Sequence, residues 1–234
     1  WESIIISSLV TIAYSALSGY WGVVTTDLFQ FVIAIAGAIM LAYFSVDKAG
    51  GLAAIKLQLA PETLSFFPPI NGEMLGTVFM TFLGYIGLSW WSKYSSDGGG
   101  VIVQRISSCK NEKEGLMATL YFNVANYALR TWPWVLAALA SLVLYPDFKD
   151  HEAVYPKMVM DLLPSGARGF VIASFFAAFM STLSTYLNLS SAYFVNDFYR
   201  PFLKKGASDA HYITVSRLAT IALSVLTAIV TYHV

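Results

Sequence analysis

Hydroxyl side chains gather on one face of a predicted helix near the C-terminal end of the chain. Residues 181–185 carry four hydroxyls inside an otherwise apolar run that is long enough to cross a bilayer. At about 100° per residue, one face of this helix holds a small residue and three hydroxyls: Ala178, Ser181, Thr182 and Thr185. Ser and Thr oxygens, with any backbone carbonyl freed nearby, are ligands that a hard cation prefers. The spacing is therefore compatible with an ion site.

The same hydroxyls are also compatible with simple helix packing. Ser and Thr in membrane helices commonly donate to the carbonyl four residues back, and their small size lets two helices pack closely. The spacing alone favours this packing interpretation. The ion-site hypothesis therefore depends on the rest of the chain.

Asp27 is a second candidate, near the start of another apolar run. Asp27 and Gln30 stand three residues apart, which is the spacing of a capping box at a helix N-terminus, where the helix dipole favours a carboxylate. We favour this capping interpretation over an ion role, although the two are compatible. With Thr185, Asp27 is also a candidate for an ion pathway.

Arg130 is a third candidate, in the middle of the apolar residues 116–144. A fixed positive charge near the bilayer centre is costly and normally faces a cavity or a partner. Snorkelling to the interface is unfavourable so far from either end of the segment. We interpret Arg130 as functional, with a structural ion pair to Asp97 as the alternative.

The composition is that of an integral membrane protein. Of 234 residues, 57% are hydrophobic and 12% are charged, against about 25% charged in a soluble domain. The net charge is zero, so we expect no nucleic-acid partner. The single cysteine excludes an internal disulfide, and no nucleophile–base pair or metal-ligand spacing points to an enzyme. We predict an all-α, multi-pass protein of the cell (inner or plasma) membrane, with the lipid bilayer as its surroundings.

Six apolar segments each approach the roughly 20 residues that a bilayer crossing needs. They cover about residues 4–20, 23–44, 74–91, 116–144, 169–194 and 212 to the end. An amphipathic piece in the loop after the second segment, at residues 52–59, is expected to lie along the membrane surface. The chain opens at Trp1 and stops at Val234 beside apolar segments. We therefore expect one transmembrane domain, residues 1–234, that is incomplete at both ends and lacks helices of its parent chain.

The third segment runs into a polar stretch and three consecutive glycines at residues 92–100. Three glycines in a row cannot continue a strong helix. One interpretation is an ordinary loop at the membrane edge. The other is a broken helix whose unwound backbone lines a cavity at membrane depth, as in secondary transporters. Both remain open on the residues alone.

The basic residues indicate the orientation of the six segments. Residues 98–115 and 196–210 together carry six Lys and Arg side chains, and the loops on the opposite side carry four, with Arg168 at the edge. The bias is mild, and it predicts that these two connections are cytoplasmic.

Three signatures in the chain resemble the sodium/solute symporter family, which includes sodium-coupled carriers of glucose, proline, iodide and vitamins. Residues 18–30 are similar to the family's Gly-Gly-x-x-Ala-Val-x-x-Thr-Asp-x-x-Gln, with the first glycine and the alanine changed. Residues 104–105 are Gln-Arg, followed by a charged Lys-Asn-Glu-Lys-Glu stretch. Residues 177–182 and 196–199 are similar to the family's Ala-Ala-x-x-Ser-Ser/Thr and Thr/Asn-Asp-x-Tyr. A bacterial branch with Gly-Gly-Gly before Gln-Arg and an Arg-x-Trp-Pro-Trp segment is the most similar.

This resemblance implies a ten-helix core of two inverted five-helix repeats, in which helices one and six are broken. The six segments would correspond to core helices four to nine, and the third would be the broken sixth helix. The eighth helix supplies half of a sodium site in this family. Carried over here, that half consists of the Ala178 carbonyl and the Ser181 and Thr182 hydroxyls, with Na⁺ as the coupling ion and the other half on the absent first helix.

The resemblance also implies where the substrate binds. The family's substrate site lies between the broken helices and their neighbours. In this chain it corresponds to Ser89, Trp90 and Trp91 around the break, and to Arg130 on the seventh helix. Sugar, organic acid and amino acid remain open as substrates, with sugars slightly favoured.

The resulting prediction is sodium-coupled symport of a small organic solute by alternating access. The alternative is a transporter-like sensor module that binds a solute and signals to an attached domain. A membrane-embedded enzyme is not expected.

Overall fold

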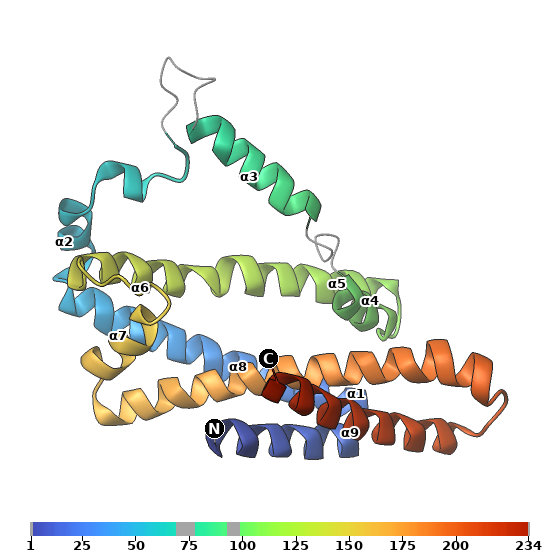
Figure 1. Cartoon of the computed structure of the whole chain (residues 1–234). Helices are drawn as coiled ribbons and strands as arrows, with labels where there is room; N and C mark the ends of the chain where they lie inside the picture. Colours follow the sequence, from blue (N-terminus) through green and yellow to red (C-terminus); the bar gives the residue numbers. More distant parts are fainter. Residues whose placement is uncertain (1, 69–77, 93–98, 234) are drawn as a thin grey trace. The chain divides into compact units, whose positions relative to one another are not determined.

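The computed structural model describes residues 2–68, 78–92 and 99–233, and these ranges are mostly helical (Figure 1). No strand occurs in them. These described residues form two compact units, one made of residues 1–36 with 172–234 and the other of residues 37–171. The all-α prediction is confirmed, whereas a single domain spanning residues 1–234 stays a prediction.

The first two predicted segments both lie in α1 (Glu2–Lys48), whose helix is interrupted at Gly19. Gly19 has φ 62° and ψ −156°, a backbone conformation that is essentially restricted to glycine. The two segments are therefore separate helices joined at the position where the sequence predicts a break.

The capping interpretation of Asp27 is wrong. The second part of α1 follows directly on Gly19, so Asp27 lies two turns inside the helix rather than at its N-terminus. A carboxylate in that position has no free backbone N–H groups of a helix end to accept from. Its hydrogen bonds go instead to another helix of the same unit.

The second unit continues with short helices. α2 (Gly51–Gln58) coincides with the predicted amphipathic piece, and η1 (Pro61–Leu64) follows it. α3 (Val78–Ser92) and α4 (Gly99–Ser107) flank the predicted helix break, but residues 93–98, which would contain the break itself, lie outside the described residues. Whether the third segment is a broken helix therefore remains a prediction.

A long helical stretch combines α5 (Glu112–Asn123), the π-helical turn η2 (Val124–Leu129) and α6 (Thr131–Leu144). It begins where Asn111 accepts a hydrogen bond from the Glu114 N–H at 2.9 Å, a side-chain cap of the helix N-terminus. At the other end of η2, Arg130 N–H donates to the Ala125 carbonyl, five residues back, at 3.0 Å. Pro133 stands just beyond, and the wider π turn accommodates a residue that cannot donate.

The core of the second unit contains a helix that the sequence did not predict. α7 (Val154–Leu162) lies in the connection between the predicted segments 116–144 and 169–194, and its buried Met158 and Val159 pack in a cluster with Leu41 and Ala137. Two apolar side chains in one turn are too short a pattern to predict a helix.

The first unit is completed by α8 (Ser165–Tyr193), of which residues from 172 belong to it, by η3 (Phe194–Leu203) and by α9 (Asp209–His233). The predicted fifth segment ends near residue 194, but the helix continues to Leu203 as π turns. Lys204 N–H donates to the Tyr199 carbonyl, five residues back, at 3.0 Å. The wider turns also accommodate Pro201 inside the helix.

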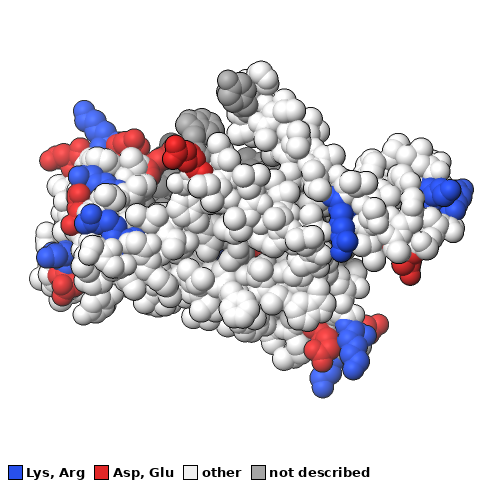
Figure 2. Space-filling model, turned by 90° about the horizontal axis from the view of Figure 1, so that it is seen from below, with Lys and Arg blue, Asp and Glu red and all other residues white. Residues whose placement is uncertain are grey.

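Four helical stretches of the described chain are long and apolar enough to cross a membrane: Glu2–Lys48, Glu112–Leu144, Ser165–Leu203 and Asp209–Thr231. The first of them contains the break at Gly19, and α3 is a shorter apolar helix. Figure 2 shows the Lys, Arg, Asp and Glu side chains visible from that side in a few groups, with broad surface free of them between the groups. The architecture is that of an all-α integral membrane protein.

Candidate functional site

Asp27 of α1 and the hydroxyl face of α8 lie against each other within the first unit. Ser181 Oγ donates to Asp27 Oδ1 at 2.6 Å, and Thr185 Oγ1 donates to Asp27 Oδ2 at 3.3 Å. Ser181 and Thr185 are one turn apart on α8, so one carboxylate accepts from both. All three side chains are half-buried. The structure therefore brings together the two residues of the predicted ion pathway, Asp27 and Thr185, with one predicted sodium ligand, Ser181.

The other two predicted sodium ligands lie on the exposed part of the same face. Thr182 Oγ1 donates to the Ala178 carbonyl oxygen at 3.0 Å, and both residues are exposed. This is the hydrogen bond to the carbonyl four residues back that the packing interpretation expects. Ser181 does not make that bond, because its hydroxyl reaches across to Asp27.

The donor set is made of oxygen atoms: one carboxylate, three hydroxyls and one backbone carbonyl. Hard cations such as Na⁺, Mg²⁺ and Ca²⁺ prefer oxygen ligands, whereas zinc and copper favour nitrogen and sulfur. Among the described residues, no group of three or more His, Cys, Asp or Glu side chains is placed to hold a metal ion. The chemistry of this face suits a monovalent or divalent hard cation.

Two further contacts hold these helices together, and the sequence analysis did not single out their residues. Tyr14 OH donates to the Met180 carbonyl oxygen at 3.3 Å, next to Ser181 on α8. The Arg217 guanidinium on α9 donates to the Leu17 carbonyl oxygen at 3.2 Å, beside the break at Gly19. That carbonyl is near the end of the first part of α1. A basic side chain there can donate to the free carbonyls of the helix end and is attracted by the negative end of the helix dipole. An arginine inside an apolar run was the signal that could have identified Arg217.

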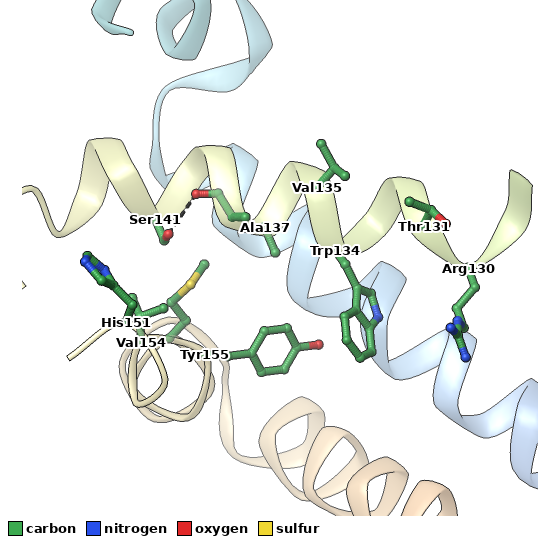
Figure 3. Close-up of a pocket in the computed structure, with 11 residues that line it drawn as sticks. Arg130, Thr131, Trp134, Val135, Ala137, Ser141, His151, Val154 and Tyr155 are labelled. Carbon is green, nitrogen blue, oxygen red and sulfur yellow. Dashed lines mark hydrogen bonds between the residues drawn. The ribbon is translucent and has the colours of Figure 1, made fainter. Parts of the chain in front are cut away.

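Arg130 borders a cavity of about 510 Å³ in the second unit, between α6 and α7 with the residues just before α7 (Figure 3). Trp134 and Tyr155 face each other in this cavity with ring centroids 6.0 Å apart, and His151 lies at its far end. Burial raises the pKa of the Tyr155 phenol above its ordinary value. The cavity combines apolar walls with a few polar groups, as small-molecule sites do.

The predicted substrate residues are only partly brought together. Ser89 and Trp91 lie at the end of α3, half-buried and 79% exposed respectively, and neither is among the described residues that line the Arg130 cavity. The Trp90 side chain lies outside the described residues, as does Asp97, the alternative partner of Arg130. A shared substrate site for Arg130 and α3 therefore remains a prediction.

Comparison with known proteins identifies the family. The model of the sodium:solute symporter family matches residues 2–234. The chain is 30% identical to sodium/glucose cotransporter 4 of Mus musculus over 96% of this chain and 37% of the relative. It is 25% identical to the high-affinity proline transporter PutP of Bacillus subtilis (strain 168), over 96% of this chain and 46% of that protein.

A solved structure shares the fold. The structure of a Na⁺-coupled sialic acid symporter, in a substrate-bound outward-open state, matches with a TM-score of 0.79 and 22% identity, covering 97% of this chain and 49% of that one. The chain thus spans less than half the length of each of these three proteins. All three are named as transporters, in agreement with the predicted multi-pass transporter segment rather than an enzyme. The chain belongs to the sodium:solute symporter family.

Proposed function

We propose that this chain is the central part of a sodium-coupled symporter that carries a small organic solute across the membrane by alternating access. The observation that carries the proposal is the contact of Asp27 with the hydroxyl face of α8. A half-buried acidic side chain that accepts from hydroxyls at membrane depth is expensive, and in transporters such groups mark ion pathways.

The proposed sodium half-site consists of the Ala178 carbonyl oxygen and the hydroxyls of Ser181 and Thr182. The Ala178 and Thr182 oxygens are 3.0 Å apart, so one hard cation at roughly 2.3–2.6 Å from each, the range for Ca²⁺, contacts both. Binding requires only that the Thr182 hydroxyl turns its hydrogen away from the carbonyl. The residues present fit a sodium ion, with the remaining ligands on parts of the protein outside this chain.

The Asp27 carboxylate has two roles in this proposal. It fixes the Ser181 rotamer, so that the Ser181 oxygen keeps its lone pairs available for a cation while its hydrogen is engaged. It also places a negative charge beside the hydroxyl face, which attracts a cation in a medium of low dielectric constant. With Thr185, which binds its other oxygen, Asp27 is the proposed step of the ion pathway after the half-site.

The proposed substrate contacts are Ser89, Trp90 and Trp91 on α3 and Arg130 at the start of α6. What supports Arg130 is its position on the cavity of the second unit. A sugar is one candidate substrate, in line with the relatives named as sodium/glucose and sodium/mannose cotransporters.

Coupling follows from differential binding. A bound ion shifts the protein between outward- and inward-facing states only by the difference of its affinity for the two. The linkage is reciprocal, so the substrate tightens sodium binding by the same factor by which sodium tightens substrate binding.

Uptake into liposomes tests this function. The full-length protein, reconstituted and loaded so that sodium runs inward, should accumulate one labelled solute from a screen of sugars, organic acids and amino acids. An equal potassium gradient is the control and should give no accumulation. If no solute accumulates although the protein still binds sodium, the symporter proposal fails and the sensor-module alternative takes its place.

A further inference from the structure

The cavity beside Arg130 has the size and lining of a ligand site. Its volume of about 510 Å³ lies within the roughly 300–1,000 Å³ of small-molecule pockets. Residues of α6 from Arg130 to Ser141 form one wall, and His151, Val154, Tyr155 and Met158 form the other (Figure 3). Most of this lining is apolar, and Arg130 is its fixed charge.

The electrostatics of the cavity favour an anion. No Asp or Glu is among the described residues that line it, so Arg130 is uncompensated there. No other described residue makes a hydrogen bond or an ion pair with its guanidinium, although the side chain lies on an apolar stretch where such a charge is costly. Asp150 and Glu152 flank His151 in the sequence, but neither lines the cavity, and Asp150 Oδ1 accepts from the N–H groups of Glu152 and Ala153.

The aromatic pair defines the rest of the ligand. In Figure 3 the Tyr155 ring points toward Trp134, and Arg130 lies beyond Trp134 along α6. The rings meet at 46° with centroids 6.0 Å apart, and Trp134 is 58% exposed, so one of its faces remains available for a flat or ring-shaped group. The Tyr155 hydroxyl is at the end of its ring that points toward Trp134 and adds a polar group to this part of the cavity.

We propose that this cavity binds a small organic anion, with its carboxylate on the Arg130 guanidinium and its ring or apolar face against Trp134 and Tyr155. The inference rests on the proposed function and names its substrate class: a carboxylate rather than a neutral sugar. A guanidinium holds a carboxylate through two parallel N–H···O bonds, which a hydroxyl or an amide cannot reproduce. Sugar acids satisfy both requirements, since the C–H face of the ring covers an aromatic side chain.

Matched pairs of probes test the inference. The full-length protein in nanodiscs is titrated with phenylacetate against phenylacetamide, and with D-glucuronate against D-glucose, each in sodium and in potassium buffer. The carboxylate of each pair should bind, and the neutral member should bind at least about tenfold more weakly, because charge-assisted bonds are lost. Arg130→Gln should weaken carboxylate binding about 10- to 100-fold, and Arg130→Lys should weaken it less.

A tryptophan pair supplies the structural control. Trp134→Ala should weaken phenylacetate binding about five- to tenfold through the lost ring contact. Trp132→Ala removes a similar side chain two positions earlier, which lines a different cavity with Tyr43, and should leave binding unchanged. Equal losses in both variants would indicate general damage to α6 and would contradict the proposed ring contact.

Two results separate this inference from the proposed function. Sodium-driven uptake of a neutral solute, with an affinity that Arg130→Gln does not change, would overturn the inference while leaving symport intact. Carboxylate binding that depends on Arg130, in a protein that accumulates no solute under a sodium gradient, would support the inference and contradict symport. If neither carboxylate binds, or if both bind Arg130→Gln as well as the native protein, the inference is wrong.

Discussion

Ser181 and Thr182 are neighbours on α8, yet their hydroxyls make different hydrogen bonds. Thr182 donates to the Ala178 carbonyl of its own helix, as a packing residue does, whereas Ser181 donates to Asp27 on α1. Local spacing cannot distinguish these cases, because both residues lie on the same helix face. The difference arises from an acceptor 154 residues away in the sequence.

Asp27→Asn tests whether the carboxylate acts by its charge. Asparagine keeps an oxygen that accepts from Ser181, so the fold should be retained, but the negative charge beside the hydroxyl face is lost. We expect the sodium concentration for half-maximal uptake to rise about tenfold, the effect of losing one interaction with a charged group. Asp209→Asn at the start of α9 is the control for a general loss of charge. An unchanged sodium dependence would limit Asp27 to a structural contact.

A pair of variants decides between the two interpretations of Arg130. If Arg130 forms a structural ion pair with Asp97, Arg130→Gln leaves an unpaired carboxylate, and the double variant Arg130→Gln/Asp97→Asn should recover most of the lost expression and thermal stability. If Arg130 binds an anionic substrate, the double variant should remain as defective in uptake as the single one. We expect the second outcome, measured as uptake per folded molecule.

The site was only partly predictable from the sequence. The hydroxyl face of α8 and Arg130 in its apolar segment are local patterns, and the sequence predicted both as candidate site residues. The Asp27 contact required the fold, and local capping rules gave the wrong role because they assumed that a helix starts near Asp27. Tyr155 and His151 of the cavity lie in what appears in the sequence as a polar loop, so no pattern connects them to Arg130.

At the scale of elements, the break in α1 depends on one glycine. Nothing lies within 4 Å of a Cβ added at Gly19, so a larger residue there meets no steric clash with its surroundings. Its φ of 62° with ψ of −156° is nevertheless closed to other residues. Any cost of substitution therefore comes from the backbone alone.

Gly19→Ala should lower the free energy of unfolding by about 1–3 kcal/mol, the cost of a strained backbone conformation. Gly84→Ala is the matched control: it also has open space around its Cβ but lies within α3, where alanine is favoured. Thermal unfolding in detergent measures both. Equal stability of Gly19→Ala and the native protein would show that α1 straightens at no cost and that the break is not fixed.

The contact between the end of α6 and α7 should respond to acid. Lys157 Nζ lies 2.8 Å from Asp161 Oδ2 and the Tyr145 hydroxyl donates to the same oxygen at 3.1 Å. The hydrogen bond from Lys157 is the main cause of the lowered pKa of Asp161. Burial, and after it the hydrogen bond to Asp161, raises the pKa of Tyr145 to about 12. A carboxyl group whose pKa is lowered by folding stabilises the folded protein at pH values above its ordinary pKa of about 3.9. This stabilisation is lost as the pH falls through the lowered pKa.

Asp161→Asn should therefore lower the melting temperature slightly near pH 6, and the difference from the native protein should shrink as the pH falls below about 4. The effect is small because both side chains of the pair are about 40% exposed to solvent. Glu62→Gln in η1, away from this contact, is the control. A difference that stays constant over this pH range would show that the carboxylate's charge does not contribute.

The π turns are the elements that the sequence did not indicate. In η2 and η3 the backbone bonds reach five residues back; Pro133 follows η2 in α6, and Pro201 lies inside η3. Standard rules end or kink a helix before proline. The fifth segment was predicted to end near residue 194, where the apolar run gives way to Asn196 and Asp197, and the helix continues about nine residues further. The extra turn width lets both helices pass the proline without ending.

At the scale of the whole molecule, hydropathy predicted the helices well. Four described stretches are able to span a bilayer, and they cover five of the six predicted segments. The numbers differ because the first stretch contains two predicted segments, one on each side of Gly19. The third segment corresponds to α3, which is shorter than a full crossing in the described residues. Segment positions follow from apolar length, which is a local property. The pairing of segments into two compact units is not local, and it could not be predicted from hydropathy.

The central claim is that the hydroxyl face of α8 contributes half of a sodium site. The most direct measurement is the sodium dependence of uptake by the full-length protein carrying Thr182→Ala, beside Thr182→Ser. A third variant, Thr214→Ala, removes a similar hydroxyl on α9 that donates to the Ala210 carbonyl at 2.9 Å and serves as control. We predict a rise of about three- to tenfold in the sodium concentration for half-maximal uptake with Thr182→Ala, and native values with Thr182→Ser and Thr214→Ala. Native sodium dependence in Thr182→Ala, at normal expression, would contradict the account and return this hydroxyl face to helix packing.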